Sequence, residues 1–367
     1  SIRPARKLWM LISHSRWKNN ASERSKMSQN VKNRIEWIDY SKGILIILVI
    51  AGHAIPEFDL HLDYLAHFIY SFHMPAFFIL SGYLFRYKKD INTVEFAKKK
   101  AKQLLIPYII FCVLIFLCHL AKQIVLGTDA KFFTMLKTKK HILGTIFMTR
   151  DSVFSNMWFL PAIFSAFCML YVIFQISKDE KTRAMICMAV GLLGLLWGKA
   201  ELTALPISME AGMLAVSFMY VGYVINAFKI DNYFGYRWVE GSSICFLLLV
   251  NYLSYNVLRY RQDSFYNVTF SNIFLFIVTA VIGLITVVGF SKYLHNSKYL
   301  SYLGRNSLYV YGLHFLNQNI IGFIGWPRGN AIGNLLILVV LTALNSIMCV
   351  IEIVIYNSIK RYLKTRV

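Results

Sequence analysis

The stretch DYSKGILIILVIAGHAIPEF, residues 39–58, has the composition of a membrane-spanning helix that carries titratable side chains. Lys42 stands near its start, and His53 lies deep inside its apolar part. The two residues are eleven positions apart, which leaves about 20° from three full turns, so both project from one face of a helix. The rise between them is about 16 Å, which puts the lysine near a headgroup layer and the histidine near mid-membrane. Asp39, one turn before Lys42, is placed for an ion pair with it.

The composition of the whole chain agrees with this interpretation. Hydrophobic residues make up 57% of the chain and charged residues only 16%, whereas soluble domains carry about a quarter charged residues. Apolar runs that approach the ~20 residues needed to cross a bilayer recur from Lys42 to the C-terminus. We therefore predict an all-α, polytopic membrane protein.

The apolar runs predict about ten transmembrane helices in one membrane domain, residues 34–367. The spans are 41–57, 65–86, 103–126, 156–176, 184–199, 209–228, 241–258, 270–290, 304–325 and 332–357. Most of the 39 basic residues then fall on the side of the N-terminus, which predicts cytoplasmic N- and C-termini in a multi-pass protein of the cell membrane. Residues 1–33 are expected to form a basic cytoplasmic tail. Because Met27 is a natural start, we expect residues 1–26 to be a non-native extension without function.

Charge and cysteine content narrow the class of partner. The chain has a net charge of +21, and its basic residues cluster between the apolar runs. Such clusters are typical of segments beside anionic lipid headgroups. We therefore predict contact with membrane lipid and none with nucleic acid. The six cysteines fall inside apolar runs without metal-ligand spacing. We therefore predict neither a disulfide framework nor a metal site.

The second span contains YSFHMPAFFILSGYLF, residues 70–85. Pro75 lacks a backbone N–H and opposes the carbonyl of Ser71, so a break is expected there, with His73 beside it. Ser81 and Gly82 favour a close-packing site between helices over a nucleophile. Two histidines embedded on consecutive helices indicate function more strongly than one.

Lysines crowd the start of the third span in FAKKKAKQLLIPY, residues 96–108. They either orient the chain in the membrane or clamp a phosphorylated ligand, for which lysine supplies point charges. The residues proposed for such a clamp are Lys98, Lys99 and Lys102, with Lys42 from the first span. No phosphate-binding glycine-rich fingerprint occurs, so nucleotide hydrolysis has no support.

Further polar residues lie in the later spans. Trp158 in NMWFLPAIF has the position of an interfacial aromatic residue, and Glu210 at the start of the sixth span faces either a cavity or the outer interface. In LGRNSLYVYGLHF, residues 303–315, three polar residues follow a spacing of four and three and therefore share a helix face. These are Ser307, Tyr311 and His314.

Taken in order, DYSKGILIILVIAGH, SFHMPAFFILSGYLF, FAKKKAKQLLIPY, MWFLPAIF and LGRNSLYVYGLH resemble the motifs of acyltransferase family 3, the membrane-bound sugar O-acyltransferases. The SFHMPAFFILSGYLF motif is similar to the fucose 4-O-acetylase-like group. Lys42 stands where the family's first helix has arginine, and His53 keeps the family's histidine position.

The resemblance implies ten helices and an O-acetyltransferase that moves an acetyl group from cytosolic acetyl-CoA to a hydroxyl of a cell-surface or lipid-linked sugar. Acetyl-CoA is the acyl donor, and no metal is required. It implies that His53 acts as general base or carries the acetyl group transiently, that His73 positions the acceptor or stabilises the oxyanion, and that Asp39 orients Lys42. A transporter or flippase with an intramembrane histidine relay is the alternative, and a non-catalytic membrane sensor is a third.

Overall fold

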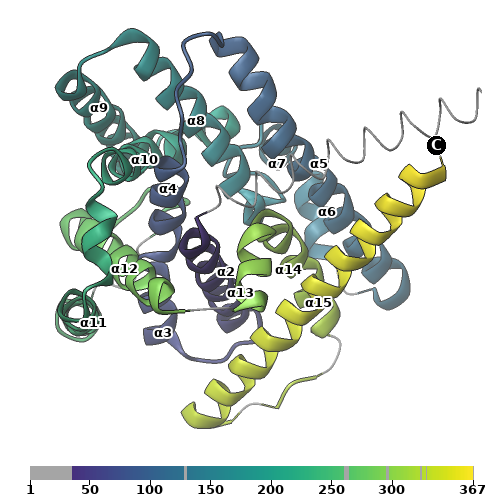
Figure 1. The fold of residues 1–367 in the computed structure, drawn as a ribbon. Coiled ribbons are helices and arrows are strands. Elements are labelled where there is room, and N and C mark those ends of the chain that lie inside the picture. Colours follow the sequence, from purple (N-terminus) through teal and green to yellow (C-terminus); the bar gives the residue numbers. More distant parts are fainter. Residues whose placement is uncertain are drawn as a thin grey trace, which may run out of the picture. The chain divides into compact units, whose positions relative to one another are not determined.

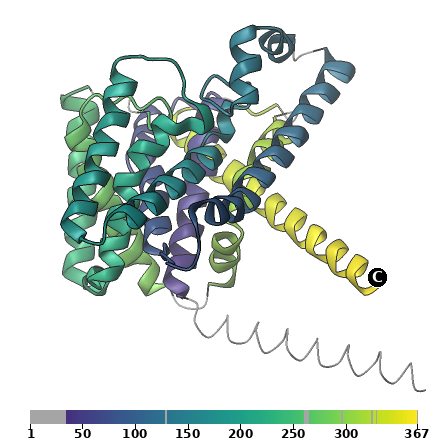
Figure 2. The same cartoon turned by 90° about the horizontal axis from the view of Figure 1, so that it is seen from above.

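The computed structural model describes residues 35–127, 130–259, 264–294, 297–322, 325–327 and 329–366. The predicted tail at residues 1–33 lies outside the described residues. Residues Ile38–Val367 form one compact unit, which Figures 1 and 2 show to be built from helices. Apart from one isolated bridge between Ser264 and Thr269, the described residues contain no β-structure.

The helices follow one another with short connections. In chain order they are α2 (Glu36–Glu57), α3 (Asp63–Tyr70), α4 (His73–Tyr83), α5 (Thr93–Leu126), α6 (Ala130–Leu136), α7 (Lys139–Ile146), η1 (Ser155–Met157), α8 (Phe159–Ile176), α9 (Glu180–Lys199), η2 (Pro206–Ser208), α10 (Met209–Ala227), η3 (Ile230–Gly235), α11 (Arg237–Tyr252), η4 (Leu253–Val257), α12 (Ile273–Tyr293), α13 (Lys298–Arg305), α14 (Ser307–Ile321) and α15 (Ala331–Arg366).

Eight helical segments of the described chain are long and apolar enough to cross a membrane, which confirms the prediction of an all-α polytopic membrane protein. The other two predicted spans, 241–258 and 304–325, are also helical but shorter. The first coincides with α11, of 16 residues, followed by the π-helical turn η4. The second is divided between the end of α13 and the 15-residue helix α14.

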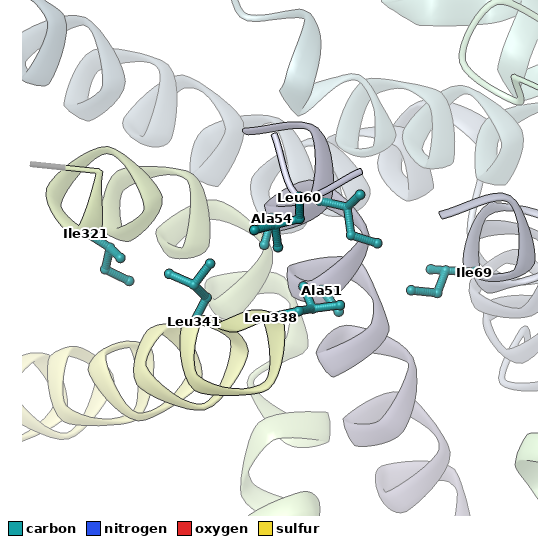
Figure 3. Packing of buried hydrophobic residues seen from close by; sticks show 8 residues of the cluster. Ala51, Ala54, Leu60, Ile69, Ile321, Leu338 and Leu341 are labelled. Atoms are coloured by element: carbon teal, nitrogen blue, oxygen red, sulfur yellow. The ribbon is translucent and has the colours of Figure 1, made fainter. Parts of the chain in front are cut away.

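Helix α2 lies inside the bundle, between α4 and α14 (Figure 1), and 72% of its membrane-spanning window is buried. Its Ala51 and Ala54 pack against Leu338 and Leu341 of α15 and against Ile321 of α14, as Figure 3 shows. The alanines let the neighbouring helices approach closely, as small residues do in membrane bundles. The two alanines, one on each side of His53 in the sequence, therefore anchor this end of α2.

Helices α4 and α10 touch through two glycines. A Cβ on Gly82 would lie 1.8 Å from the carbonyl oxygen of Met219, and a Cβ on Gly222 would lie 1.8 Å from that of Ile79. No side chain fits either position unless the backbones separate. The Ser81–Gly82 pair is thus a close-packing site, as the sequence indicated.

We expect Gly82→Ala to lower the free energy of unfolding by about 1–3 kcal/mol, because the added methyl group overpacks the α4–α10 contact. The measurement is the thermal midpoint of the detergent-purified protein, read by loss of the monodisperse chromatographic peak. Gly241→Ala in α11 is the matched control, since a Cβ there meets nothing within 4 Å. A midpoint for Gly82→Ala equal to that of Gly241→Ala would contradict the predicted contact.

Candidate active site

A cavity of about 550 Å³ lies among α2, α4, α5, α8 and α14. Its wall is mostly apolar and aromatic, with polar side chains in a minority, which is the usual character of a small-molecule site. The polar and charged residues of its lining are Lys42, Ser81, Arg86, Lys88, Glu95, Lys99, Lys100, Gln103, Tyr171, Ser307 and Tyr311. The cationic side chains outnumber the single carboxylate, so the cavity favours an anionic ligand.

One face of α2 forms a wall of this cavity. Lys42, Ile46 and Val49 line it, and they follow one another at helical spacing. His53 comes one turn after Val49 on the same face. Periodicity placed Lys42 and His53 on one face of α2. That face lines the cavity from Lys42 to Val49, and His53 lies one turn further along it.

His53 lies among aromatic rings beyond the part of α2 that lines the cavity. Its ring centroid is 5.4 Å from that of His314, 4.8 Å from that of Phe315 and 6.2 Å from that of Tyr70. Tyr311, which lines the cavity, has its ring centroid 5.8 Å from that of His314. The cavity is therefore adjacent to the histidine cluster, which consists of His53, His73 and His314.

The three histidines of this region differ in their hydrogen bonds. The Nδ1 of His73 lies 2.7 Å from the carbonyl oxygen of Ile69, and the Nδ1 of His314 lies 3.3 Å from that of Val310. Because a carbonyl only accepts, both rings carry a proton on Nδ1. His53, which is half-buried, makes no hydrogen bond to any described residue. Its two ring nitrogens are therefore the ones left open to a ligand.

Pro75 accounts for the position of His73. The chain leaves α3 at Tyr70 and re-enters a helix at His73, which confirms the predicted break. The carbonyl of Ser71, which has no amide partner at Pro75, lies 3.3 Å from the hydroxyl of Thr279 on α12. The His73 ring caps the end of α3 through its bond to Ile69.

The lysines of α5 divide between two faces. Helix α5 begins at Thr93, ten residues before the predicted span, so the lysine run is helical. Lys99 and Lys100 line the cavity, and the Nζ of Lys100 lies 3.6 Å from the centre of the Phe167 ring. Lys98 and Lys102 are exposed and do not line it. Among the proposed clamp residues, the structure brings Lys42 and Lys99 together.

Asp39 is held at the contact between α2 and α13. Its carboxylate lies 3.5 Å from the Nε of Arg305, while a Cβ on Gly304 would lie 1.8 Å from the Asp39 carbonyl oxygen. The glycine lets the two backbones meet, and the arginine next to it reaches the carboxylate. Arg305 belongs to the LGRNS motif, but its partner could not be inferred from sequence.

Ser81 and Ser307 both line the cavity. Ser81 donates to the carbonyl oxygen of Phe77 at 2.8 Å, a contact typical of a helical serine. Tyr311 donates to the carbonyl oxygen of Asn156 at 2.7 Å, which links α14 to η1.

Trp158 and Glu210 lie outside the cavity lining. Trp158 stacks on Phe265 with ring centroids 5.9 Å apart. Glu210 is fully buried; its carboxylate lies 3.6 Å from the Nε of Arg150 and accepts from the amide of Leu205 at 3.2 Å. Glu210 therefore helps to fix the connections around α7 and η2.

Sequence reasoning missed six polar residues of the cavity lining, and Tyr70 beside it. The six are Arg86, Lys88, Glu95, Lys100, Gln103 and Tyr171. Lys100 and Gln103 line the cavity. They differ from the neighbouring residues of α5 only in the side of the helix that they occupy, which the sequence alone does not give. Tyr70 donates to the carbonyl oxygen of Gly52 at 3.1 Å and stands between His53 and His73. Its position depends on the break at Ser71, which shifts the helix phase. Within the described chain, no group of three His, Cys, Asp or Glu side chains is placed to hold a metal ion.

The fold and the cavity define a multi-pass membrane protein with a basic, mostly apolar ligand site that adjoins a histidine cluster. Comparison with known proteins identifies its class. The profile of the membrane acyltransferase domain of acyltransferase family 3 matches residues 35–352, and the chain belongs to this family. The matched model is that of an acyltransferase domain, which points to acyl transfer as the class of reaction.

Two curated relatives are similar over part of the chain. The nodulation protein NolL of Sinorhizobium fredii is 32% identical over 158 residues, 40% of this chain and 38% of the relative. NolL of Mesorhizobium japonicum is 29% identical over 174 residues, 43% of this chain and 41% of the relative. The match thus spans about two fifths of each relative's length. No solved structure matches the chain significantly.

We expect a cysteine at position 307 to react with an anionic, water-soluble methanethiosulfonate reagent about tenfold faster than one at a closed position, because thiol reactivity follows access and a basic environment. Ser307→Cys tests the cavity wall. Ser291→Cys is the control, since Ser291 is 1% exposed. Both are made after the exposed Cys245 is changed to serine. Equal rates at 307 and 291, measured by mass spectrometry, would show that the cavity is closed to water.

Proposed function

We propose that this protein is an O-acetyltransferase that moves the acetyl group of acetyl-CoA to a hydroxyl of a cell-surface or lipid-linked sugar. The observation that carries the proposal is His53, a histidine without a hydrogen-bond partner among the described residues, which follows the inner end of a cavity with a basic mouth. Family membership supports acyl transfer as the class of reaction. Residues 34–367 are taken as the acyltransferase domain.

The cavity suits an acyl-CoA donor by its distribution of charge. Lys42, Lys99 and Lys100 supply the cations that phosphate groups require. The apolar stretch of α2 at Ile46 and Val49 suits the uncharged pantetheine arm. A donor bound in this way carries its thioester along α2 toward His53. The N- and C-termini are then cytoplasmic, because the lysine-rich mouth faces the compartment that contains acetyl-CoA.

The chemistry we assign to the histidine cluster is general base catalysis. His53 takes the proton of the sugar hydroxyl while the oxygen attacks the thioester carbonyl, so that a C–O bond forms. The C–S bond then breaks, and the CoA thiolate takes up the proton from the imidazolium. The buried Nε2 of His314 has no partner within the described chain, and with ring centroids 5.4 Å apart it supports the protonated form of His53.

The other predicted residues have supporting roles in this proposal. His73 fixes the break beside the site and orients Tyr70 toward His53, while Asp39 and Arg305 hold the start of α2. Ser81, Ser307 and Tyr311 belong to the wall that contacts the donor. Trp158 and Glu210 hold the connections outside the cavity. The sugar acceptor is inferred from the motifs that resemble sugar O-acyltransferases.

We expect His53→Ala to lower the rate of acetyl transfer by about 10²–10⁴-fold, the usual effect of removing a general base. The assay follows radiolabel from acetyl-CoA into a crude surface-glycan extract, together with release of free CoA. His61→Ala is the matched control, because His61 is exposed on the connection between α2 and α3. Equal transfer by both variants would exclude His53 as the base.

The same experiment distinguishes direct transfer of the acetyl group from transfer through an acetyl-histidine intermediate. Label that stays on the protein when acceptor is omitted, and that requires His53, would indicate a transient acetyl-histidine in place of direct transfer. A folded protein that neither binds nor consumes acetyl-CoA would refute the donor assignment and favour the transporter alternative.

We expect Lys99→Ala and Lys100→Ala to raise the KM for acetyl-CoA about three- to tenfold, since both side chains line the cavity mouth but are partly screened by water. Lys98→Ala and Lys102→Ala, on the exposed face of the same helix, are expected to change KM less than twofold. The measurement is CoA release at varied acetyl-CoA concentration. Equal effects from the two pairs would mean that the lysines act only through their summed charge.

A further inference from the structure

A second pocket, of about 320 Å³, adjoins the candidate active site. It lies where α8 and α10 end and α9 begins, beside the segment that follows α4. Phe85 and Arg86 line both this pocket and the larger cavity. The two sites therefore share these two wall residues.

Arg86 is the cation of the shared wall. Its Nη1 donates to the carbonyl oxygens of Tyr83 and Phe85, at 3.1 and 3.0 Å. It makes no ion pair with any acidic side chain of the described residues. Its remaining N–H groups are available for an anion, and the planar guanidinium suits two oxygens of one phosphate.

The rest of the second pocket has the character of a site for an aromatic base. The rings of Phe174 and Tyr223 meet edge to face with centroids 4.7 Å apart, and Tyr87 lies 6.0 Å from Phe174. The amide nitrogen of Asn226 donates to the carbonyl oxygen of Tyr83 at 2.5 Å. This leaves its Oδ1 as an acceptor without a partner in the described chain.

A second arginine is held rigidly in this pocket. Arg183 lies 2.7 Å from the Glu180 carboxylate, donates to the Ser177 carbonyl oxygen at 2.9 Å, and covers the Phe174 ring at 4.2 Å. Asp179 caps the start of α9 by accepting from the amide and hydroxyl of Thr182, both at 2.8 Å. These donors lower the pKa of Asp179, so the cap stays charged and fixes the helix that carries Arg183.

We propose that the second pocket binds the 3′-phosphorylated adenosine of the CoA donor, with Arg86 on the phosphate groups that connect it to the pantetheine arm in the larger cavity. The inference rests on the proposed function and adds to it the site that distinguishes CoA from shorter thioesters. The adenine stacks against the aromatic rings, and its exocyclic amine donates to Asn226.

The test compares acetyl-CoA with acetyl-pantetheine, which lacks the phosphates and the nucleotide, as donors for the purified full chain. We expect the unmodified protein to show a KM for acetyl-CoA at least about tenfold lower. Tyr223→Ala should raise the KM for acetyl-CoA about tenfold while leaving kcat and the KM for acetyl-pantetheine unchanged. Arg86→Ala, which changes both pockets, should raise the KM for acetyl-CoA about tenfold and by more than it raises the KM for acetyl-pantetheine. Arg237→Ala, an exposed arginine that lines neither pocket, is the matched control.

A binding measurement makes the outcome independent of turnover. Adenosine 3′,5′-bisphosphate should bind the unmodified protein and bind the Arg86→Ala and Tyr223→Ala variants about tenfold more weakly. Variants that lose both donors equally, or that bind the bisphosphate as the unmodified protein does, would overturn the second pocket as the nucleotide site. If neither donor releases its free thiol, CoA or pantetheine, while bisphosphate binding is intact, the proposed transferase reaction is refuted and this pocket remains a nucleotide site.

Discussion

The close contact between α2 and α13 fixes the rotation of α2, and the candidate site depends on that rotation. A Cβ on Gly304 would lie 1.8 Å from the Asp39 carbonyl oxygen, and a Cβ on Gly43 would lie 2.3 Å from that of Leu300. Because both contacts are between backbones, α2 cannot turn without losing them. A turn of one residue, about 100°, would move Lys42 away from the cavity and His53 away from its aromatic neighbours. The contacts of Gly43 and Gly304 thus set the position of His53, ten residues after Gly43 in the sequence.

The cost of burying polar groups explains why the histidine cluster has this form. A break in a membrane helix exposes backbone carbonyls that have no water to bond, so they need internal partners. At the α3–α4 break, the ring of His73 and the hydroxyl of Thr279 supply them. His314 is likewise tied to its own helix. The Nε2 of His314 has no partner within the described chain, and His53 makes no hydrogen bond to any described residue. Polar groups without a partner are costly to bury, and that cost favours a functional role for His53.

Features that depend on one helix at a time could be predicted from the sequence. Apolar runs predicted the eight membrane-spanning segments of the described chain, periodicity predicted the common face of Lys42 and His53, and Pro75 predicted the break. Periodicity could not divide the lysines of α5, because the predicted span began at residue 103 and α5 begins at Thr93. Contacts between distant segments, such as Arg305 with Asp39 and Arg150 with Glu210, leave no periodic signal. The stacking of Trp158 on Phe265, a residue more than a hundred positions away, is another contact of this kind.

The order of groups along the cavity also bears on how hydrolysis is avoided. Under the proposed function, the cationic side chains that line the cavity attract an anionic donor from water, where long-range steering is effective. The apolar stretch of α2 beyond them offers water few partners, so a bound acyl-pantetheine arm displaces it. The thioester would then reach the histidine in a site from which competing water is excluded. Under the proposed function, transfer to a sugar hydroxyl is favoured because the arm itself seals the passage behind the acetyl group.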